Sequence, residues 1–431
     1  MGTHGTHPFF LLIHSSLDTF DVSSYCTIPL EKEVYKLHRP VAQAIIHCLG
    51  EIIIRQYPAD KVIERCFKEN PKFGKRDRGT IASNVYDIVR NYVLIRHCAD
   101  QKNDLWGMLG IWILNCNYTL PAWDEFAHVN RSNIRQRWNE AIKDKRLQYS
   151  VPVELDQIGK SELGDRWYRE MQAMHVPGQM ILRVNTLKSN MKQVITVLRG
   201  NEIQFEQFKD EYHEAIKINQ RINLFTSDLF KQGFVEVQDY ASQQVAHFIK
   251  PQSGQRIIDA CAGGGGKALH LATLMQNKGR VLALDIDQYK LSNLHKRAVR
   301  DGIDIIETKW IENNKVIKRL EGQADILLLD VPCTGSGVIK RNPDSKYRID
   351  KNFITGILEK QSQILMDYCK MTKPGGDLIY CTCSIFNSEN RKQVDSFLSN
   401  HPFFEFQEER TLWPSEFGYD GFYMARMKRI R

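Results

Sequence analysis

The sequence predicts an α/β protein with a Rossmann-like, doubly wound sheet in its C-terminal part and an all-helical domain before it. Three observations predict this fold class. After Lys250, short apolar segments of strand character alternate with helical segments, which is typical of parallel sheets covered by helices. One of these strands runs into a glycine-rich turn that opens a helix. Between Val34 and about Cys98, the apolar residues recur at helical spacing instead.

The helical domain is expected to span residues 31–150. Its helices should break at Tyr57-Pro58 and at Asn70-Pro71, because the residue before a proline is steered away from helical backbone angles. Residues 1–30 are expected to form a poorly ordered extension, whose apolar stretch at residues 8–13 is too short to span a membrane. The length of 431 residues is enough for two or three packed domains.

Residues 151–250 are expected to form a mixed α/β segment, with strands at about 180–186 and 234–239. Residues 251–431 then form the Rossmann-like domain. Its strands should run parallel because helices connect them, and the last one should lie at the edge of the sheet. The predicted strands are Arg256–Asp259, Arg280–Asp285, Asp304–Thr308, Ala324–Asp330, Asp377–Thr382 and Gly421–Met427.

The composition is that of an ordinary globular protein, with 42% hydrophobic and 26% charged residues. The formal net charge of +8 suits a polyanionic partner without requiring one. The ten cysteines include no C-x-x-C pair, which disfavours both a zinc module and a secreted disulfide framework. We therefore expect a soluble, cytoplasmic and monomeric protein with no metal site and no membrane segment.

A nucleotide-type cofactor site is predicted where the first strand of the C-terminal domain ends. Asp259 is followed by a run of four glycines and Lys267, and a helix begins there. Asp285, 20 residues after Gly265, ends the next strand, where a carboxylate can accept hydrogen bonds from both ribose hydroxyls. The residues expected to bind the cofactor are Cys261, Ala262, Gly263, Gly264, Gly265, Gly266, Lys267, Asp285 and Asp330.

The glycine pattern alone leaves the cofactor open. Gly263, Gly265 and Ala268 also satisfy a loose dinucleotide-binding fingerprint, so a nicotinamide-dependent oxidoreductase remains an alternative. A phosphate-binding loop of the nucleoside triphosphatase type is disfavoured, because Ala268 rather than Ser or Thr follows Lys267.

Two further strands each lead to a cysteine. One strand ends in Asp330 and continues through Pro332 to Cys333, and the other leads through Thr382 to Cys383. Both thiols should meet at the carboxyl edge of the sheet, where open α/β sheets bind ligands. Methylation of cytosine at carbon 5 needs a thiolate that first adds to carbon 6, an acid such as Asp330 near ring nitrogen 3, and a group that helps release the product. Two cysteines and a carboxylate supply such a set.

These ordered motifs resemble the RsmB/Sun type of RNA 5-methylcytosine methyltransferases, within the wider NOL/NOP/Sun group, over nearly the whole chain after Val34. The resemblance implies S-adenosylmethionine as the cofactor, Cys383 as the nucleophile, Cys333 as the cysteine that helps release product, and Asp330 as a residue that grips the base or cofactor. The N-terminal helices resemble the NusB-like RNA-binding domain of the bacterial branch that modifies small-subunit rRNA, which favours rRNA over tRNA as the substrate.

Three basic segments are expected to contact RNA. The first is the turn from Pro71 to Arg78 ahead of a helix, and the second is similar to a segment that flanks the RNA cleft in this family. The third follows the Asp-x-Pro-Cys motif, where Lys340, Arg341, Lys346 and Arg348 should make the mouth of the site basic. The residues expected to bind RNA are Lys75, Arg76, Arg78, Arg183, Asn185, Lys188, Lys340 and Arg341.

The sequence departs from the family pattern at three places. Gly264 stands where the family has proline, and Ala268 stands where it has threonine. The third strand of the domain ends in Lys309-Trp310-Ile311 in place of an acid near the adenine, with Glu312 as the nearest carboxylate. The altered loop keeps open a second alternative, a non-catalytic rRNA-binding assembly factor that retains the fold.

Overall fold

The computed structural model describes residues 35–208, 214–220 and 222–431, so the predicted extension at residues 1–30 lies outside the described residues. The chain divides into two compact units. The helical unit comprises residues up to Pro177 together with Ile339–Lys351, and the α/β unit comprises Gly178–Val338 and Asn352–Arg431. Each unit is described by itself.

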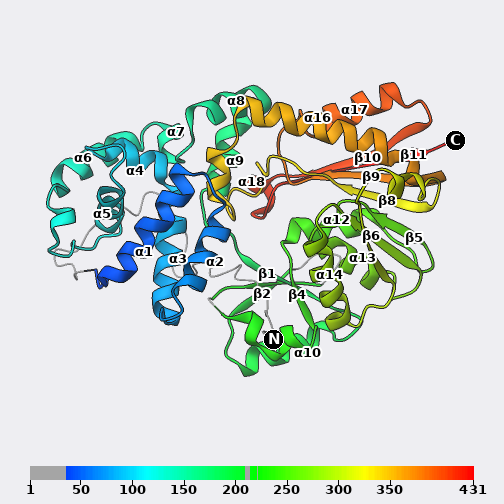
Figure 1. The fold of residues 1–431 in the computed structure, drawn as a ribbon, viewed down its shortest axis with the longest axis horizontal. Helices are drawn as coiled ribbons and strands as arrows, with labels where there is room; N and C mark the ends of the chain where they lie inside the picture. Colours follow the sequence, from blue (N-terminus) through cyan, green and yellow to red (C-terminus); the bar gives the residue numbers. More distant parts are fainter. Residues whose placement is uncertain (1–34, 209–213, 221) are drawn as a thin grey trace. The chain divides into compact units, whose positions relative to one another are not determined.

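The helical unit confirms the predicted all-helical segment and its two breaks. One helix ends at Glu69 and the next begins at Lys75, on either side of Pro71, and Pro58 directly precedes another helix. This unit extends past residue 150, and its helices fit a NusB-like domain packed around one apolar core. Its helices are α1 (Arg39–Leu49), α2 (Ala59–Glu69), α3 (Lys75–Arg90), α4 (Tyr92–Cys98), α5 (Leu105–Asn115), α6 (Arg131–Ala141), α7 (Lys145–Gln148), α8 (Val153–Leu163) and α9 (Trp167–Met174), with a π-helical turn at Gly50–Ile54 (Figure 1).

The segment Ile339–Lys351, which follows the Asp-x-Pro-Cys motif in the sequence, belongs to the helical unit. Lys346 is 1% exposed, and its Nζ donates to the carbonyls of Arg90 at 2.9 Å, Tyr149 at 3.2 Å and Ser150 at 2.9 Å. Burial lowers the pKa of Lys346 well below its usual range, and the charge of Arg90 lowers it further. Lys346 therefore fastens this segment to the ends of two helical regions.

This burial corrects the predicted basic mouth. Lys340 is only 2% exposed, and its carbonyl accepts a hydrogen bond from Arg90 Nη2 at 3.0 Å. Arg348 is paired with Asp344 at 2.6 Å. The side chain of Lys346 lies in the interior of the helical unit, so in this structure it is not placed to contact RNA.

The α/β unit begins with a four-stranded antiparallel sheet of order β2-β3-β1-β4. The two predicted strands are confirmed as β1 (Met180–Val184) and β4 (Val235–Val237), whereas β2 (Phe205–Gln207) and β3 (Ala215–Ile218) were not predicted. The helices α10 (Met191–Gly200) and α11 (Asp228–Lys231) accompany this sheet.

The second sheet confirms the Rossmann-like prediction. Its seven strands have the order β10-β11-β9-β8-β5-β6-β7, and all pairs from β9 to β7 are parallel. The parallel strands are β5 (Arg256–Asp259), β6 (Arg280–Asp285), β7 (Ile306–Trp310), β8 (Ala324–Asp330) and β9 (Thr372–Thr382), and the antiparallel ones are β10 (Phe404–Leu412) and β11 (Phe422–Arg429).

One expectation about this sheet was wrong, and one of its strands was not predicted. The last strand, β11, is not an edge strand, because it lies between β9 and β10 and pairs antiparallel with both. The true edge, β10, was not recognised in the sequence, since most of its residues between Phe404 and Leu412 are charged, polar and exposed. Such a strand takes its conformation from pairing with β11 rather than from an apolar pattern of its own.

Helices cover both faces of this sheet (Figure 1). One apolar core contains residues of α12 (Tyr240–Ile249), α13 (Gly266–Leu274) and α14 (Gln288–Asp301). The other contains residues of α15 (Lys315–Lys318), α16 (Lys351–Tyr368) and α17 (Arg391–Asn400). The short helix α18 (Pro414–Phe417) precedes β11.

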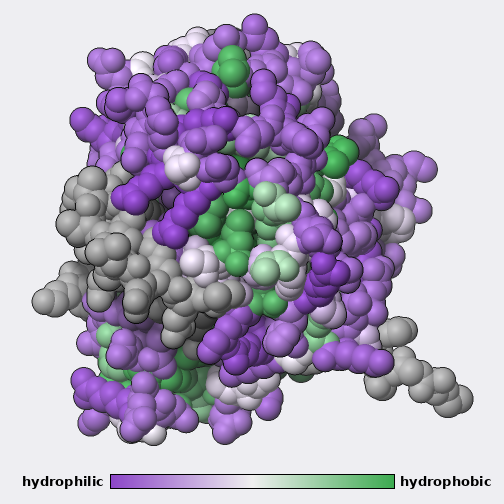
Figure 2. All heavy atoms as spheres, turned by 90° about the vertical axis from the view of Figure 1, so that its left-hand side faces the viewer, coloured by the Kyte–Doolittle hydropathy of each residue, from purple (hydrophilic) through white to green (hydrophobic). Residues whose placement is uncertain are grey.

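Seen from the left-hand side of Figure 1, the surface is mostly hydrophilic, with apolar side chains gathered near the middle of the view (Figure 2). Over the part of the chain that the structure describes, none of the helices combines the length and the apolar character that a membrane span requires.

Candidate active site

The predicted cofactor loop connects β5 to α13 in a conformation that requires glycine. Gly265 has a φ of +82°, and a Cβ atom on it would lie 2.3 Å from Leu294. The amide of Gly263 donates to Asp285 Oδ2 at 2.7 Å, which ties the loop to the end of β6. Gly264, where the family has proline, accepts a hydrogen bond from Arg297 through its carbonyl. The loop and Asp285 are therefore brought together as predicted.

Exposed apolar side chains flank Asp285. Ile286 follows it and is 64% exposed, and Trp310 at the end of β7 is 42% exposed. The indole Nε1 of Trp310 donates to the carbonyl of Ile286 at 3.0 Å, which fixes the ring beside the strand end. An apolar surface next to a carboxylate suits a ligand that joins a flat ring to a sugar.

Lys267 and Asp330, two of the predicted residues, form an ion pair. Lys267 Nζ lies 2.5 Å from Asp330 Oδ2, and the Cys381 thiol donates to Asp330 Oδ1 at 3.5 Å. Burial disfavours the ammonium charge, but the carboxylate of Asp330 more than offsets this and raises the pKa of Lys267. Asp330 therefore carries a fixed counter-ion at the carboxyl edge of the sheet.

Asp259, at the end of β5, is a buried carboxylate that the sequence did not single out as a site residue. It is 1% exposed, and neither of its oxygens reaches a hydrogen-bond partner among the described residues. Burial, together with the charge of Asp330, raises its pKa to about 7. A cationic ligand group bound nearby would stabilise its charged form.

The raised pKa of Asp259 predicts a pH dependence of stability. Because the folded state holds this proton more tightly than the unfolded chain, the contribution of Asp259 is most favourable below pH 4 and is lost as pH rises through 7. We compare the free energy of unfolding of Asp259→Asn with that of the parent at each pH. Relative to the parent, the variant should be about 2 to 4 kcal/mol more stable at pH 8 than it is at pH 4. Urea unfolding at both pH values measures this difference, and parallel pH profiles would contradict the assignment.

The two predicted cysteines meet. β8 and β9 are parallel neighbours, with Asp330 opposite Cys381 in register, so the loops that follow them leave the sheet side by side. The sulfur atoms of Cys333 and Cys383 lie 3.1 Å apart, and both thiols are free and partly exposed. The hydrogen bond with Cys383, followed by burial, raises the pKa of Cys333 well above its usual value. Either sulfur can be the donor in this contact, and the raised pKa disfavours the thiolate form of Cys333.

Glu389 holds both cysteine loops and was missed in the sequence. Its fully buried carboxylate accepts hydrogen bonds from the Thr334 amide at 2.8 Å, the Thr334 hydroxyl at 2.5 Å, the Ser384 hydroxyl at 2.5 Å and Gln361 Nε2 at 3.0 Å. Thr334 follows Cys333 and Ser384 follows Cys383, so one side chain sets the spacing of the two thiols. Burial raises the pKa of Glu389, and these hydrogen bonds oppose that shift.

Replacing Glu389 with Ala should lower the free energy of unfolding by about 2 to 4 kcal/mol, because it leaves several buried donors without an acceptor. Replacement with Gln is the matched control. Its oxygen can still accept from the Thr334 amide, and its NH2 group can donate to the Thr334 and Ser384 hydroxyl oxygens. Urea unfolding should show a much smaller loss for Gln than for Ala. Equal losses would mean that Glu389 does not connect the two loops in this way.

The structure gives Arg183 and Asn185 structural roles in place of the predicted RNA contacts. Both are 1% exposed. Arg183 Nη1 donates to the carbonyl of Gly266 at 2.9 Å, where α13 begins. Asn185 Nδ2 donates to the carbonyls of Gly233 and Asp301, at 2.8 and 2.9 Å. In this structure neither side chain is placed to contact RNA; both fasten β1 to elements of the Rossmann-like domain.

The other predicted RNA ligands remain accessible to different degrees. Lys75, Arg76 and Lys188 are exposed and Arg341 is half-buried. Lys188 Nζ donates to the carbonyl of Arg300 at 2.9 Å. Arg78 is half-buried, and its Nε donates to the carbonyl of Phe73 at 2.8 Å, so part of its role is to close the turn before α3.

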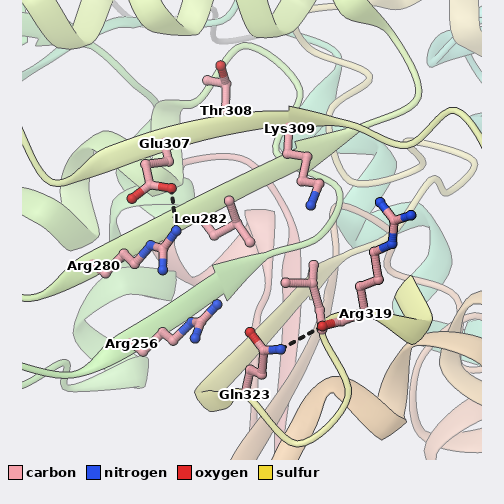
Figure 3. Close-up of a pocket in the computed structure, with 9 residues that line it drawn as sticks. Arg256, Arg280, Leu282, Glu307, Thr308, Lys309, Arg319 and Gln323 are labelled. Carbon is pink, nitrogen blue, oxygen red and sulfur yellow. Dashed lines mark hydrogen bonds and ion pairs between the residues drawn. The ribbon is translucent and has the colours of Figure 1, made fainter. Parts of the chain in front are cut away.

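A basic cavity of about 300 Å³ lies beside β5, β6 and β7, at residues that the sequence did not single out. Arg280 is paired with Glu307 at 2.5 Å. Arg256 and Lys309 extend toward the space between them, and Arg319 lies at one side (Figure 3). Four cations against one carboxylate give this cavity a net positive charge that suits a phosphate group.

Comparison with known proteins identifies similar families and structures. Residues 246–428 match the family described as 16S rRNA methyltransferase RsmB/F, and residues 157–224 match the ferredoxin-like domain of RsmF/B-like methyltransferases. The chain is 32% identical over 272 residues to the probable ribosomal RNA small subunit methyltransferase B of Bacillus subtilis, covering 59% of this chain and 60% of that relative. With ribosomal RNA small subunit methyltransferase B of Shewanella oneidensis it shares 32% identity over 311 residues, covering 69% and 72%.

Two solved structures are also similar. The crystal structure of PH0851 aligns with a TM-score of 0.76 and 25% identity over 92% of this chain and 100% of its own. A methyltransferase homolog protein from Pyrococcus horikoshii aligns with a TM-score of 0.58 and 25% identity over 66% of this chain and 98% of its own.

Proposed function

Because the chain belongs to the RsmB/F family of 16S rRNA methyltransferases, we propose that it methylates carbon 5 of a cytosine in small-subunit rRNA. The cofactor is S-adenosylmethionine, the methyl donor of this family. The single observation that carries the cytosine chemistry is the 3.1 Å separation of the Cys333 and Cys383 sulfur atoms at the carboxyl edge of the sheet. Family membership removes the support for a nicotinamide-dependent oxidoreductase.

The residues around the cofactor loop fit S-adenosylmethionine. Asp285 would accept hydrogen bonds from the ribose hydroxyls, and Ile286 and Trp310 would contact the adenine ring in place of the missing acid. The buried carboxylate of Asp259 would attract the ammonium group of the methionine moiety. When bound, the cofactor supplies an electrophilic methyl group.

The proposed reaction begins at Cys383. Its thiolate adds to carbon 6 of the cytosine, which makes carbon 5 nucleophilic enough to take up the methyl group. Asp330, the last residue of β8, is paired with Lys267. It would protonate or hydrogen-bond ring nitrogen 3 of the base. Deprotonated Cys333 then accepts the proton from carbon 5 and returns to a thiol, while the double bond re-forms and the bond between carbon 6 and Cys383 breaks, which releases the Cys383 thiolate. Cys333 assists this last step, because its sulfur is adjacent to that of Cys383.

The target base must be unpaired or flipped out, since both reacting ring carbons are hidden in a stacked duplex. We assign contacts with the RNA backbone to the exposed cations Lys75, Arg76 and Lys188, with Arg341 as a further candidate. The basic cavity around Arg256 and Lys309 is suited to hold a phosphate of the same RNA.

The experiment is transfer of a labelled methyl group from S-adenosylmethionine to free small-subunit rRNA and to ribosomal particles, followed by bisulfite mapping of the product. We expect incorporation into at least one of the two substrates and a single protected cytosine. Label at a position other than carbon 5 of cytosine would refute the proposed chemistry. No transfer to either substrate would favour the non-catalytic assembly factor instead.

A further inference from the structure

Two histidines and a glutamate converge at a place that the proposed reaction does not use. His247 lies in α12, His270 lies in α13, and Glu214 directly precedes β3. They are distant from one another in the sequence and match no metal-binding motif there. In the fold, their ligand atoms all lie within 4.8 Å of one another.

The geometry is close to that of a metal site. His270 Nε2 lies 2.9 Å from Glu214 Oε2, and His247 Nε2 lies 3.9 Å from Glu214 Oε1. Nitrogen and oxygen ligands about 2.0 to 2.2 Å from a tetrahedral zinc ion are separated by about 3.3 to 3.6 Å. The two separations from Glu214 lie on both sides of this range, and the ligand atoms of the two histidines lie within 4.8 Å of each other, so the three side chains would have to draw together around the ion.

The surroundings also favour a cation. The side chains of His270, His247 and Glu214 are 0%, 7% and 12% exposed, so the cluster is shielded from water.

We propose that Glu214, His247 and His270 bind one divalent transition-metal ion, with zinc as the best match. Two imidazoles and one carboxylate suit zinc, whereas calcium and magnesium prefer oxygen ligands throughout. The ion would connect the start of β3 to α12 and α13. Since α13 begins at the end of the cofactor loop, this connection would stabilise the position of that loop. The site differs from the sequence expectation of no metal, and it does not depend on the proposed methyl transfer.

The test uses the full-length chain with Cys333 and Cys383 both replaced by Ser, so that the adjacent thiols cannot bind the added metal. The protein is loaded with zinc, and unbound zinc is removed by dialysis. We expect it to retain one zinc ion per chain, and its Tm to be several degrees higher than that of a chelator-treated sample. Cobalt in place of zinc should give visible d–d bands without the charge-transfer absorption of a thiolate ligand. No stoichiometric zinc together with an unchanged Tm would overturn the proposal.

Variants then locate the ion. His247→Gln and His270→Gln should each weaken zinc binding by about 100-fold or more, since each removes one of three ligands. His295→Gln, at an exposed histidine in α14, is the matched control and should bind zinc like the parent. If a buried histidine variant fails to fold, Glu214→Gln is tested in its place. This substitution keeps the size of the Glu214 side chain and removes its charge. Unchanged zinc affinity in the folded ligand variants would place the ion elsewhere and refute the site.

Discussion

Replacing Cys383 with Ala is expected to reduce methyl transfer to RNA by at least about 1,000-fold, because the reaction then lacks the nucleophile that activates carbon 5. The Ala variant should fold normally, since Cys383 is partly exposed at the end of a strand and its side chain is small. Binding of S-adenosylmethionine should be little changed, because the residues proposed to hold it lie on β5, β6 and β7. The measurement is the rate of labelled methyl transfer at saturating RNA.

The control for this loss is Cys369→Ala. Cys369 is a buried cysteine of the same unit that packs in the apolar core away from the thiol pair. Its replacement should cost some stability but leave the transfer rate within a few-fold of the parent. If Cys383→Ala keeps more than a tenth of the parent rate, addition of Cys383 to the base is not part of the reaction.

Replacing Cys333 with Ala is expected to trap a covalent complex between the protein and RNA. The structure suggests why the two cysteines differ. The hydrogen bond with Cys383, followed by burial, raises the pKa of Cys333, which disfavours Cys333 as the thiolate that attacks the base. Without it, Cys383 can still add to the base, but release after methylation lacks its assisting group. The complex should survive denaturing electrophoresis and should require both RNA and S-adenosylmethionine.

The double variant, with both cysteines replaced by Ala, distinguishes this result from nonspecific crosslinking. It should give no complex, because the proposed bond forms through Cys383. If instead Cys383→Ala accumulates the complex and Cys333→Ala does not, the roles of the two cysteines are exchanged. This outcome would leave the proposed overall reaction intact while reversing the assignment within the pair.

The Rossmann-like order of elements was predictable because its signals are local. Glycines that permit the turn after β5, and buried strands with continuous apolar runs, are recognisable from short stretches of sequence. The position of β11 between β9 and β10 could not be predicted, because β10 is a polar edge strand whose conformation depends on a partner strand distant in the sequence. The strands β2 and β3, of only three and four residues, were also recognised only in the structure.

Whether an individual polar side chain is buried or exposed was the feature least predictable from the sequence. The sequence suggested that Arg183 and Lys346 are surface cations, but both side chains are buried and hydrogen-bonded within their own units. A buried cation is stable only where carbonyls or carboxylates from several elements surround it. Those partners come from distant parts of the chain, so their presence cannot be inferred from neighbouring residues.

The sequence by itself determined the fold class, the position of the cofactor loop and the delivery of Cys333 and Cys383 to strand ends, because each depends on local backbone preference and on the periodicity of apolar residues. Only the tertiary structure decided that the two sulfur atoms lie 3.1 Å apart, that Glu389 holds both of their loops, and that His247 and His270 face Glu214. Such groupings arise when strand pairing and helix packing bring together side chains whose separation along the chain carries no signal.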